Sequence, residues 1–389
     1  MPEPLVVLQV IPRMRAGGAE LGCLQIAEAI MSAGGRALVA SQGGRLADKL
    51  TELGGTHITL PMATKNPLRM YANARALAAI IAKEKVNVIH ARSRAPAWSA
   101  LWSARKTGIA FVTTYHGEYR EQNKFKNLYN SVMAKSDKVI AVSDNIGRLI
   151  KERYGTPENR IAVIHRAFDP AKFETAAATP EKIAEVRRGL NVPDGARILM
   201  LAGRISPNKA HDHLIEAVGL LPKEDARSFV LVFPGEVEKA DYARSFTARA
   251  QALGVEIRLP GHLDNVGAAM AASWALFNIS RTEGLPRVVI EAQAMGVPVV
   301  VSDSGPGREV ALTPPDTPLA QATGLRVPYN DPPGLANAIK TLMAMSDAER
   351  AAMGQRGSAH VRARYTLARM TGQTLEVYRE VTAARARRS

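Results

Sequence analysis

Short apolar runs alternate with longer segments of helical periodicity along almost the whole chain. Such runs, rich in valine, isoleucine and leucine, are typical of strands that are buried on both faces of a parallel sheet. Regular alternation of these strands with helices indicates a doubly wound α/β fold. The expected strands are 5–11, 37–41, 57–60, 86–91, 111–116, 138–142, 161–165, 197–202, 229–233, 255–259, 275–279, 297–301 and 324–327.

The segments between these strands carry helix signals. Ser143 is a suitable N-cap for a helix that ends near Arg153, and Gly34-Gly35 is expected to end the first helix. The pattern predicts helices at 20–32, 46–53, 69–83, 96–106, 124–135, 144–153, 180–190, 211–221, 242–253, 288–295, 332–345, 347–364 and 367–384.

Length and a change in composition indicate two domains. A chain of 389 residues is long enough for about two domains, and 46% hydrophobic residues can supply two cores. Residues 169–195 are rich in alanine, threonine and proline, and we interpret them as the interdomain connection. The expected domains are therefore 1–168 and 196–364, and a C-terminal helix follows at 365–389.

Four loops that follow expected strands carry residues suited to ligand binding. They contain Gly17-Gly18, His116-Gly117, Arg204 to Lys209, and Glu283 to Pro286. In open α/β sheets, ligands bind outside the carboxyl ends of the strands. Because the loops come from both halves of the chain, one cleft served by both domains is the simplest arrangement that uses them all.

The stretch from Arg281 to Glu291 is a candidate for a ligand site. Pro286 is expected near the first position of a helix, with Glu291 about a turn and a half inside it and Glu283 on the preceding loop. The free N–H groups at a helix start favour an anion, so the stretch could hold a phosphate through its backbone and hydroxyl groups through its carboxylates. The alternative is an ordinary βαβ crossover with two solvated glutamates.

The other three loops each have a functional and an ordinary interpretation. Gly17-Gly18 at a helix start either lets the backbone approach an anion or forms a plain tight turn. His116 lies beside a glycine that leaves room for a ligand, and its alternative role is structural. Arg204 supplies a planar guanidinium and Lys209 a compact charge, and both suit a diphosphate. The alternative is that both are solvated surface cations.

The charge of the chain indicates an anionic partner. The formal net charge is +15 and the pI is about 10.0, which suits nucleic acid, acidic lipid or a phosphorylated substrate. No apolar run approaches the roughly 18–20 residues of a membrane span, and residues 5–11 lack the basic flank of a signal peptide. We therefore expect a cytoplasmic protein that can attach to a membrane surface by charge. The single cysteine, Cys23, is expected to be a small buried hydrophobe.

Residues 119–135 combine apolar side chains at helical spacing with several lysines. Phe125 and Leu128 belong to the apolar set, and Lys124 and Lys126 lie beside them. The segment could dock on an anionic membrane surface or an acidic acceptor, and the alternative is an ordinary amphipathic core helix. The basic residues at 385–388 form an expected tail that adds electrostatic attraction.

Several catalytic signatures are missing from the sequence. It contains no Asp-x-Asp metal clamp, no Gly-x-Gly-x-x-Gly and no P-loop. It also lacks His-Glu-x-x-His, Cys-x-x-Cys and the Gly-x-Ser-x-Gly nucleophile elbow. The sequence therefore gives no support for dinucleotide binding, for P-loop phosphate binding, or for catalysis by these metal and nucleophile motifs.

Taken together, the motifs resemble a glycosyltransferase of family 4, which has the two-domain GT-B fold. The resemblance covers essentially the whole chain and implies that the last helix crosses back onto the N-terminal domain. It rests on five stretches in the family's order: Gly17-Gly18-Ala19-Glu20, Thr114 to Gly117, Asp137 to Ser143, Gly203-Arg204 with Lys209, and the Glu-x7-Glu signature of Glu283 and Glu291.

The resemblance implies a retaining transfer of a hexose from a nucleotide sugar, with the donor as a substrate and with no cofactor or bound metal. Glu291 would bond the ribose hydroxyls, and Glu283 would hold hydroxyls of the donor sugar near the reacting carbon. Arg204 and Lys209 would neutralise the diphosphate that leaves, because fixed cations stabilise developing charge.

The resemblance also gives roles to backbone groups and to the N-terminal domain. Gly284 and Leu285 would offer N–H groups to the donor, and Gly17-Gly18 would face its diphosphate from the other domain. His116 would lie beside the transferred sugar. Domain closure would exclude water and limit hydrolysis.

One stretch and two single positions depart from the family's pattern. Residues 165–169 read His-Arg-Ala-Phe-Asp where the family usually has Pro-Asn-Gly-Val-Asp, so a donor contact from this hinge-side loop is in doubt. Ala210 replaces the usual glycine after the lysine of the Gly-Arg motif. Arg287 stands where many members have an apolar or small residue, and it either adds a phosphate contact or is solvated.

Charge and resemblance together predict an anionic glycolipid acceptor such as lipopolysaccharide core, with mannose from GDP-mannose as the preferred donor. They also predict peripheral contact with the cytoplasmic face of the inner membrane. One alternative is a soluble-acceptor enzyme of the sucrose- or trehalose-synthase kind. Another is a non-catalytic nucleic-acid-binding protein, suggested by the pI alone. The chain has only 5% aromatic residues and lacks RNA-binding aromatic and helix-turn-helix patterns, so nucleic acid is not an expected partner.

Overall fold

The computed structural model describes residues 4–15, 17–119 and 123–387. The chain divides into two compact units, one formed by residues 1–166 with 368–389 and the other by residues 167–367. The second unit includes residues 169–195. Within the segment expected at 119–135, residues 120–122 lie outside the described residues, and so does Arg388 of the basic tail.

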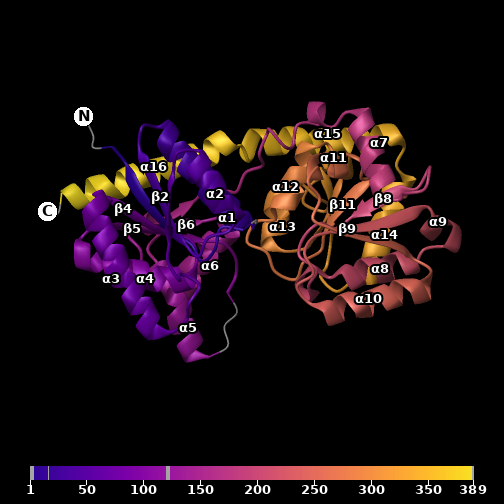
Figure 1. Cartoon of the computed structure of the whole chain (residues 1–389). Coiled ribbons are helices and arrows are strands. Elements are labelled where there is room, and N and C mark those ends of the chain that lie inside the picture. Colours follow the sequence, from indigo (N-terminus) through magenta and orange to yellow (C-terminus); the bar gives the residue numbers. More distant parts are fainter. Residues whose placement is uncertain (1–3, 16, 120–122, 388–389) are drawn as a thin grey trace. The chain divides into compact units, whose positions relative to one another are not determined.

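The N-terminal unit is built on a seven-stranded sheet in the order β3-β2-β1-β4-β5-β6-β7, with every neighbouring pair parallel (Figure 1). Its strands are β1 (Val6–Val10), β2 (Arg36–Ser41), β3 (Thr56–Thr59), β4 (Val88–Ala91), β5 (Ala110–Tyr115), β6 (Lys138–Ala141) and β7 (Ile161–Val163). Its helices are α1 (Gly18–Ser32), α2 (Arg45–Glu52), α3 (Pro67–Glu84), α4 (Arg94–Thr107), α5 (Lys124–Ser131), α6 (Asp144–Tyr154) and almost all of α16 (Leu367–Ala386), with 3-10 turns η1 (Val132–Ala134) and η2 (Glu158–Arg160).

The C-terminal unit is built on a six-stranded parallel sheet in the order β10-β9-β8-β11-β12-β13. Its strands are β8 (Arg197–Met200), β9 (Phe229–Pro234), β10 (Glu256–Gly261), β11 (Ala275–Asn278), β12 (Val299–Ser302) and β13 (Gly324–Val327). Its helices are α7 (Pro180–Gly189), α8 (His211–Gly219), α9 (Lys223–Arg227), α10 (Ala240–Leu253), α11 (Val266–Ala271), α12 (Arg287–Ala294), α13 (Gly305–Val310), α14 (Pro332–Ala344) and α15 (Asp347–Arg364), with 3-10 turns η3 (Thr175–Ala177), η4 (Pro207–Lys209) and η5 (Leu319–Gln321).

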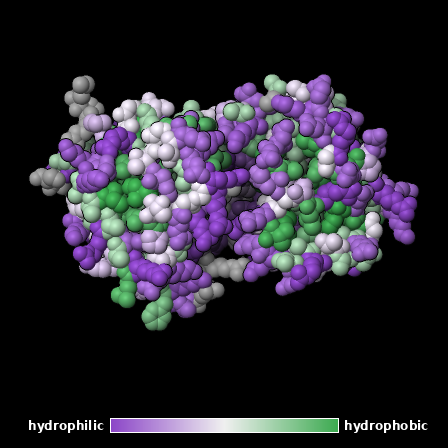
Figure 2. Space-filling view, viewed as in Figure 1, coloured by the Kyte–Doolittle hydropathy of each residue, from purple (hydrophilic) through white to green (hydrophobic). Residues whose placement is uncertain are grey.

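These two sheets confirm the predicted doubly wound α/β fold. Every expected strand is present, and its ends shift by a residue or two at most. The central strands are buried along their whole length, which is why they read as continuous apolar runs. Polar side chains cover most of the visible surface of each unit (Figure 2). None of the described helices combines the length and apolar composition that crossing a membrane requires.

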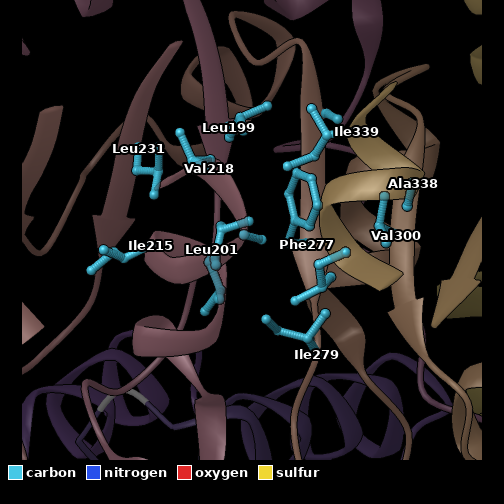
Figure 3. Packing of buried hydrophobic residues seen from close by; sticks show 14 of the residues in the cluster. Leu199, Leu201, Ile215, Val218, Leu231, Phe277, Ile279, Val300, Ala338 and Ile339 are labelled. Atoms are coloured by element: carbon cyan, nitrogen blue, oxygen red, sulfur yellow. The ribbon is translucent and has the colours of Figure 1, made fainter. Parts of the chain in front are cut away.

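Each unit has its own hydrophobic core. In the C-terminal unit, Leu199 of β8, Phe277 of β11 and Ile339 of α14 point toward one another (Figure 3). In the N-terminal unit, the core includes Tyr378 of α16, whose hydroxyl lies 2.6 Å from Nδ1 of the buried His90. Burial of apolar area contributes about 25 cal/mol per Å², so these clusters supply the main stabilising term of each unit.

The first helix and the segment expected as a helix at 124–135 both differ from the prediction. The first helix begins at Gly18 and not at Glu20, and Gly17 is its N-cap. The segment expected as one helix at 124–135 is a short α5 followed by a 3-10 turn, with Phe125 and Leu128 exposed. The core-helix alternative for this segment is therefore wrong for the face that carries Phe125 and Leu128, although Val132 and Met133 are buried.

Candidate active site

Two loops at the carboxyl ends of neighbouring strands β8 and β11 are tied together in the C-terminal unit. The backbone N–H of Arg281 donates to the carbonyl of Asn208 at 2.9 Å. Asn208 Nδ2 donates to the carbonyl of Thr282 at 3.1 Å, and the Thr282 hydroxyl returns a bond to Asn208 Oδ1 at 3.0 Å. The sheet order places these loops side by side, and the asparagine fixes their relative position.

Lys209 and Glu283 form an ion pair between these two loops. Lys209 Nζ lies 2.6 Å from Glu283 Oε1, and the side chains are only 16% and 19% exposed. Burial raises the pKa of the Glu283 carboxyl, but the charge of Lys209 and its hydrogen bond outweigh burial and hold this pKa below its ordinary value. The structure thus brings together two of the predicted site residues and keeps the carboxylate ionised.

Arg204 lies apart from this pair. Its side chain is 71% exposed, and its Nη1 lies 3.3 Å from a carboxylate oxygen of Glu238. The two cations of the motif therefore face different partners, since Lys209 binds Glu283. A guanidinium this exposed keeps the rotamer freedom that would let it reach an incoming anion.

Glu291 and Arg287 pair within α12. Arg287 Nη2 donates to Glu291 Oε1 at 2.9 Å, one turn apart on the helix. Their side chains are 11% and 12% exposed, so neither residue is the solvated surface group that the alternative interpretations required. Arg287 Nε is buried and has no hydrogen-bond partner among the described residues. One guanidinium donor thus stays available beside the helix start.

The start of α12 follows directly on the buried residues Gly284 and Leu285. Pro286 is the N-cap, one position before the first helical residue, and has no side-chain cap. A helix start of this kind presents backbone N–H groups and a partial positive charge. The predicted backbone donors therefore lie between the two carboxylates of the Glu-x7-Glu signature.

In the N-terminal unit, Gly17 and Gly18 form the start of α1 and not a plain tight turn. The N–H of Gly17 donates to Oε2 of Glu20 at 2.5 Å, which is the half of a capping box that needs no side chain at the N-cap. A side chain at position 17 would press against this carboxylate at 3.1 Å. The helix start predicted to face a diphosphate therefore already holds the carboxylate of Glu20.

His116 follows β5 and is held by Arg166. Its Nδ1 lies 3.2 Å from Arg166 Nη1, and Arg166 also donates to the carbonyl of Gly18. Burial, then the charges of Arg166 and Arg92, lower the pKa of His116 well below its ordinary value. His116 Nε2 is buried without a partner in the part of the chain that the structure describes. The ring is neutral and presents an unused nitrogen.

Arg92 is a buried cation that the sequence analysis did not single out. It directly follows β4, is 5% exposed, and donates through Nε to Gln9 Oε1 at 2.7 Å. Gln9 in turn donates to the carbonyl of Cys23, whose thiol is buried as expected and has its pKa raised by burial to about 11. The same strand-end criterion that selected Arg204 would have found Arg92.

Family models match both halves of the chain. Residues 16–172 match Glycosyltransferase Family 4, and residues 182–360 match Glycosyl transferases group 1. A D-inositol 3-phosphate glycosyltransferase of Saccharomonospora viridis is 29% identical over 263 residues, which is 65% of this chain. The chain spans only 58% of the length of that relative.

Solved structures share the whole fold. A glycosyltransferase from Rickettsia africae ESF-5 is 29% identical with a TM-score of 0.86, and the match covers 97% of this chain and 98% of that one. Anabaena HepE in complex with UDP-glucose is 20% identical with a TM-score of 0.81, covering 96% and 99%. The chain therefore matches a Glycosyltransferase Family 4 model and then a Glycosyl transferases group 1 model, and it has the GT-B fold of two Rossmann-like units.

Proposed function

We propose that this protein is a glycosyltransferase that moves a hexose from a nucleotide sugar to an anionic acceptor. The observation that carries the proposal is the set of Lys209, Glu283 and Glu291 on the loops and helix that follow β8 and β11. These residues lie in the half that matches the Glycosyl transferases group 1 model. The likeness to the Rickettsia africae glycosyltransferase supports the same activity.

In this proposal, each residue of the C-terminal unit binds one part of the donor. Glu291 binds the ribose hydroxyls, and Arg287 holds its carboxylate in place. Glu283 binds hydroxyls of the transferred sugar, and Lys209 passes from Glu283 to the diphosphate when the donor enters. Cations and helix-start dipoles aimed at a leaving diphosphate stabilise the charge that develops there.

Arg204, Gly284 and Leu285 complete the proposed contacts to the diphosphate. The exposed Arg204 contributes a second cation, and the two backbone N–H groups contribute neutral donors. For the N-terminal unit, contacts of His116 with the sugar and of Gly17-Gly18 with the diphosphate stay predictions. No cofactor or metal enters this scheme.

We propose a retaining reaction. The bond from the anomeric carbon to the leaving phosphate oxygen breaks, and the acceptor oxygen bonds to the same face of that carbon. The proton of the acceptor hydroxyl passes to the leaving phosphate. The scheme assigns no nucleophile to the protein, because the acceptor oxygen bonds directly to the anomeric carbon.

The donor and acceptor are proposed by class. GDP-mannose was the donor expected from the sequence, and the UDP-glucose complex of the distant HepE makes UDP-hexoses equal candidates. The net charge of +15 supports an anionic acceptor such as lipopolysaccharide core. The relative from Saccharomonospora viridis, named for an inositol phosphate, is consistent with a soluble phosphorylated acceptor as the alternative.

Calorimetric titration with a panel of UDP-, GDP-, ADP- and dTDP-sugars tests the proposal. We expect one donor to bind, and Glu291→Ala to weaken that binding about tenfold because it loses charge-assisted hydrogen bonds. Glu283→Ala should mainly lower turnover. If no nucleotide sugar binds while oligonucleotides bind with a steep salt dependence, the protein is a nucleic-acid-binding protein and the proposal fails.

We also propose that α5 contacts the membrane surface where a lipid-linked acceptor lies. Phe125 is 85% and Leu128 58% exposed, and lysines at 124 and 126 flank them. Apolar surface gathers where α5 lies in the N-terminal unit (Figures 1 and 2). Apolar side chains beside cations suit the boundary of an anionic bilayer. Phe125→Ser with Leu128→Ser should reduce sedimentation with phosphatidylglycerol vesicles, and unchanged sedimentation would exclude this contact.

A further inference from the structure

A pocket in the N-terminal unit lies outside the residues assigned so far. Its volume is about 540 Å³, within the range of roughly 300–1,000 Å³ typical of small-molecule sites. Residues after β1, β2 and β3 line it, so it opens at the carboxyl ends of three adjacent strands. Ligands of open α/β sheets bind at such strand ends. The lining residues used below are Arg13, Arg15, Gln42, Gly44 and Thr59.

Three backbone hydrogen bonds lock together the two loops that carry the arginines and the glutamine. Met14 donates to the carbonyl of Gly43 at 2.9 Å, Leu46 donates to that of Met14 at 2.8 Å, and Gln42 donates to that of Pro12 at 3.1 Å. The Met14 side chain is fully buried, while Arg13 and Arg15 on either side of it line the pocket. The loop thus holds two guanidiniums at one opening.

Gly44 makes this close approach possible. Its φ of 132° is a conformation that L side chains rarely adopt. A Cβ at this position would lie 2.5 Å from the carbonyl oxygen of Met14. A side chain would therefore force the loops apart, so glycine here serves the geometry of the pocket.

The pocket carries positive charge without a counter-charge. None of the described residues that line it has a carboxylate. Across the described ranges, neither Arg13 nor Arg15 forms an ion pair, and Arg13 Nε donates to Gln42 Oε1 at 3.5 Å. The start of α2 also faces this loop with Gly44 as its N-cap and no side-chain cap. Guanidinium forks and a helix start together favour a phosphate.

The remaining lining suits a hydroxyl-bearing compound. Gln42 offers an amide, and Thr59 a hydroxyl, beside the two arginines. We infer that this pocket binds the phosphate of a polyhydroxylated, phosphorylated acceptor. The inference rests on the proposed function, and it names the acceptor class of that reaction. The phosphate can belong to a free sugar or polyol phosphate, or to a glycolipid headgroup.

The test compares the wild type with Arg13→Gln/Arg15→Gln. Binding of glucose 6-phosphate, with glucose as its unphosphorylated match, reports a free phosphate source by calorimetry. Sedimentation with phosphatidylcholine vesicles that contain or lack phosphatidylinositol reports a lipid source. We expect phosphate-dependent binding in at least one arm, and a loss of about tenfold or more in the double variant.

A matched control separates site binding from general charge. Arg105→Gln/Lys106→Gln removes the same two charges from the exposed end of α4, before β5 and thus at the opposite edge of the sheet. This control should keep binding within about twofold of the wild type. An equal loss in the control, or no phosphate-dependent binding in either arm, overturns the inference.

Donor binding distinguishes this inference from the proposed function. The best nucleotide sugar should bind the double variant as tightly as it binds the wild type, because neither Arg13 nor Arg15 is among the proposed donor contacts. A loss of donor binding only in Arg13→Gln/Arg15→Gln would show that the pocket belongs to the donor and would overturn the acceptor assignment. Failure of every donor to bind the wild type would sink the proposed function, while phosphate binding would still report on the pocket.

Discussion

Arg166 Nη1 lies 3.2 Å from His116 Nδ1. A guanidinium can only donate, so Nδ1 must accept and the ring proton must lie on Nε2. Nε2 is buried without a partner in the described part of the chain, and burial with two nearby arginines keeps the pKa of the ring well below its ordinary value. Arg166 therefore fixes His116 as a neutral ring with its N–H directed away from the arginine.

Arg166→Gln should remove the interaction that keeps the His116 ring neutral. The pKa of His116 should rise toward its ordinary value because one of the cations that lowers it is gone. Turnover of the variant should then fall at a higher pH than that of the wild type as pH is lowered below the ordinary histidine pKa of 6.5. We expect roughly tenfold lower turnover at neutral pH with donor affinity changed less than about twofold. Steady-state kinetics and nitrogen NMR shifts of the ring measure both effects.

Arg166→Lys and Arg36→Gln are the comparisons. Lysine keeps the charge, so it should retain the low pKa of His116 and recover part of the turnover. Arg36 lies at the amino end of β2 and pairs with Glu84, so its loss should leave the pH profile unchanged. Titration of wild-type His116 in the usual histidine range would contradict the assignment.

The strands were predictable because burial on both faces leaves a continuous apolar run, and both sheets, of seven and six strands, follow from that pattern. The short helices α9, α11 and α13 were not predicted. Residues 305–310 read Gly-Pro-Gly-Arg-Glu-Val, a poor helix former by composition. The helix exists because the Ser304 side chain caps it, accepting from the N–H of Gly307 at 3.3 Å. A local side-chain cap thus determined a helix that the hydrophobic periodicity does not indicate.

The sequence predicted that the candidate site residues follow the ends of strands. It did not predict which of their side chains contact one another. Lys209 and Glu283 follow neighbouring strands, but sequence order alone does not show which strands are neighbours or which cation turns inward. Arg204 turns to Glu238, on a loop that no motif marked. By contrast, Arg287 and Glu291 are four residues apart on one helix, so their ion pair could have been predicted from the sequence.

Lys209→Ala should destabilise the C-terminal unit. It leaves the mostly buried Glu283 without its cation, at a cost of about 2 kcal/mol in the free energy of unfolding. The folded pKa of Glu283 lies below its ordinary 4.5, so the stabilisation from the pair is complete above that pH and is lost as pH falls through the lower folded value. Urea unfolding near pH 7 and pH 3 measures the effect.

Two variants check that the loss belongs to this pair. Glu283→Gln in the Lys209→Ala background should recover part of the stability, because no buried charge then remains. Lys223→Ala removes an exposed lysine from α9 of the same unit and should change stability by less than about 0.5 kcal/mol. An additive double variant would mean that the two side chains do not interact.

Tyr378→Phe should weaken the attachment of α16 to the N-terminal unit. The hydroxyl of Tyr378 lies 2.6 Å from His90 Nδ1, and His90 Nε2 lies 2.7 Å from the hydroxyl of Thr114. Removing one partner leaves a polar atom of a fully buried ring unsatisfied, at a cost of about 1–2 kcal/mol. Tyr71→Phe, at an exposed tyrosine, should be nearly neutral in the same urea titration. Equal effects of the two variants would remove the hydrogen bond as the cause.

His211 should make the C-terminal unit sensitive to acid. Its ring is buried against Phe246 and Phe233, and both ring nitrogens lack partners among the residues that the structure describes. Burial, with a smaller contribution from Lys209, lowers its pKa to about 3. The unfolded chain then binds a proton more readily than the folded one, so stability is full above about pH 6.5 and falls toward pH 3. The expected loss by pH 5 is about 2 kcal/mol.

His211→Leu should flatten this dependence, because leucine cannot be protonated and keeps a comparable apolar volume. Urea unfolding at pH 8 and pH 5 should show a difference about 2 kcal/mol smaller in the variant than in the wild type. Part of the slope should remain, since burial also lowers the pKa of His90 and His116. His262→Gln, at an exposed histidine, should leave the slope as it is in the wild type. If His211→Leu leaves the slope unchanged, the ring is not the group whose protonation opposes folding, and the acid sensitivity must come from other groups, among them His90, His116 and His360, whose pKa values burial also lowers.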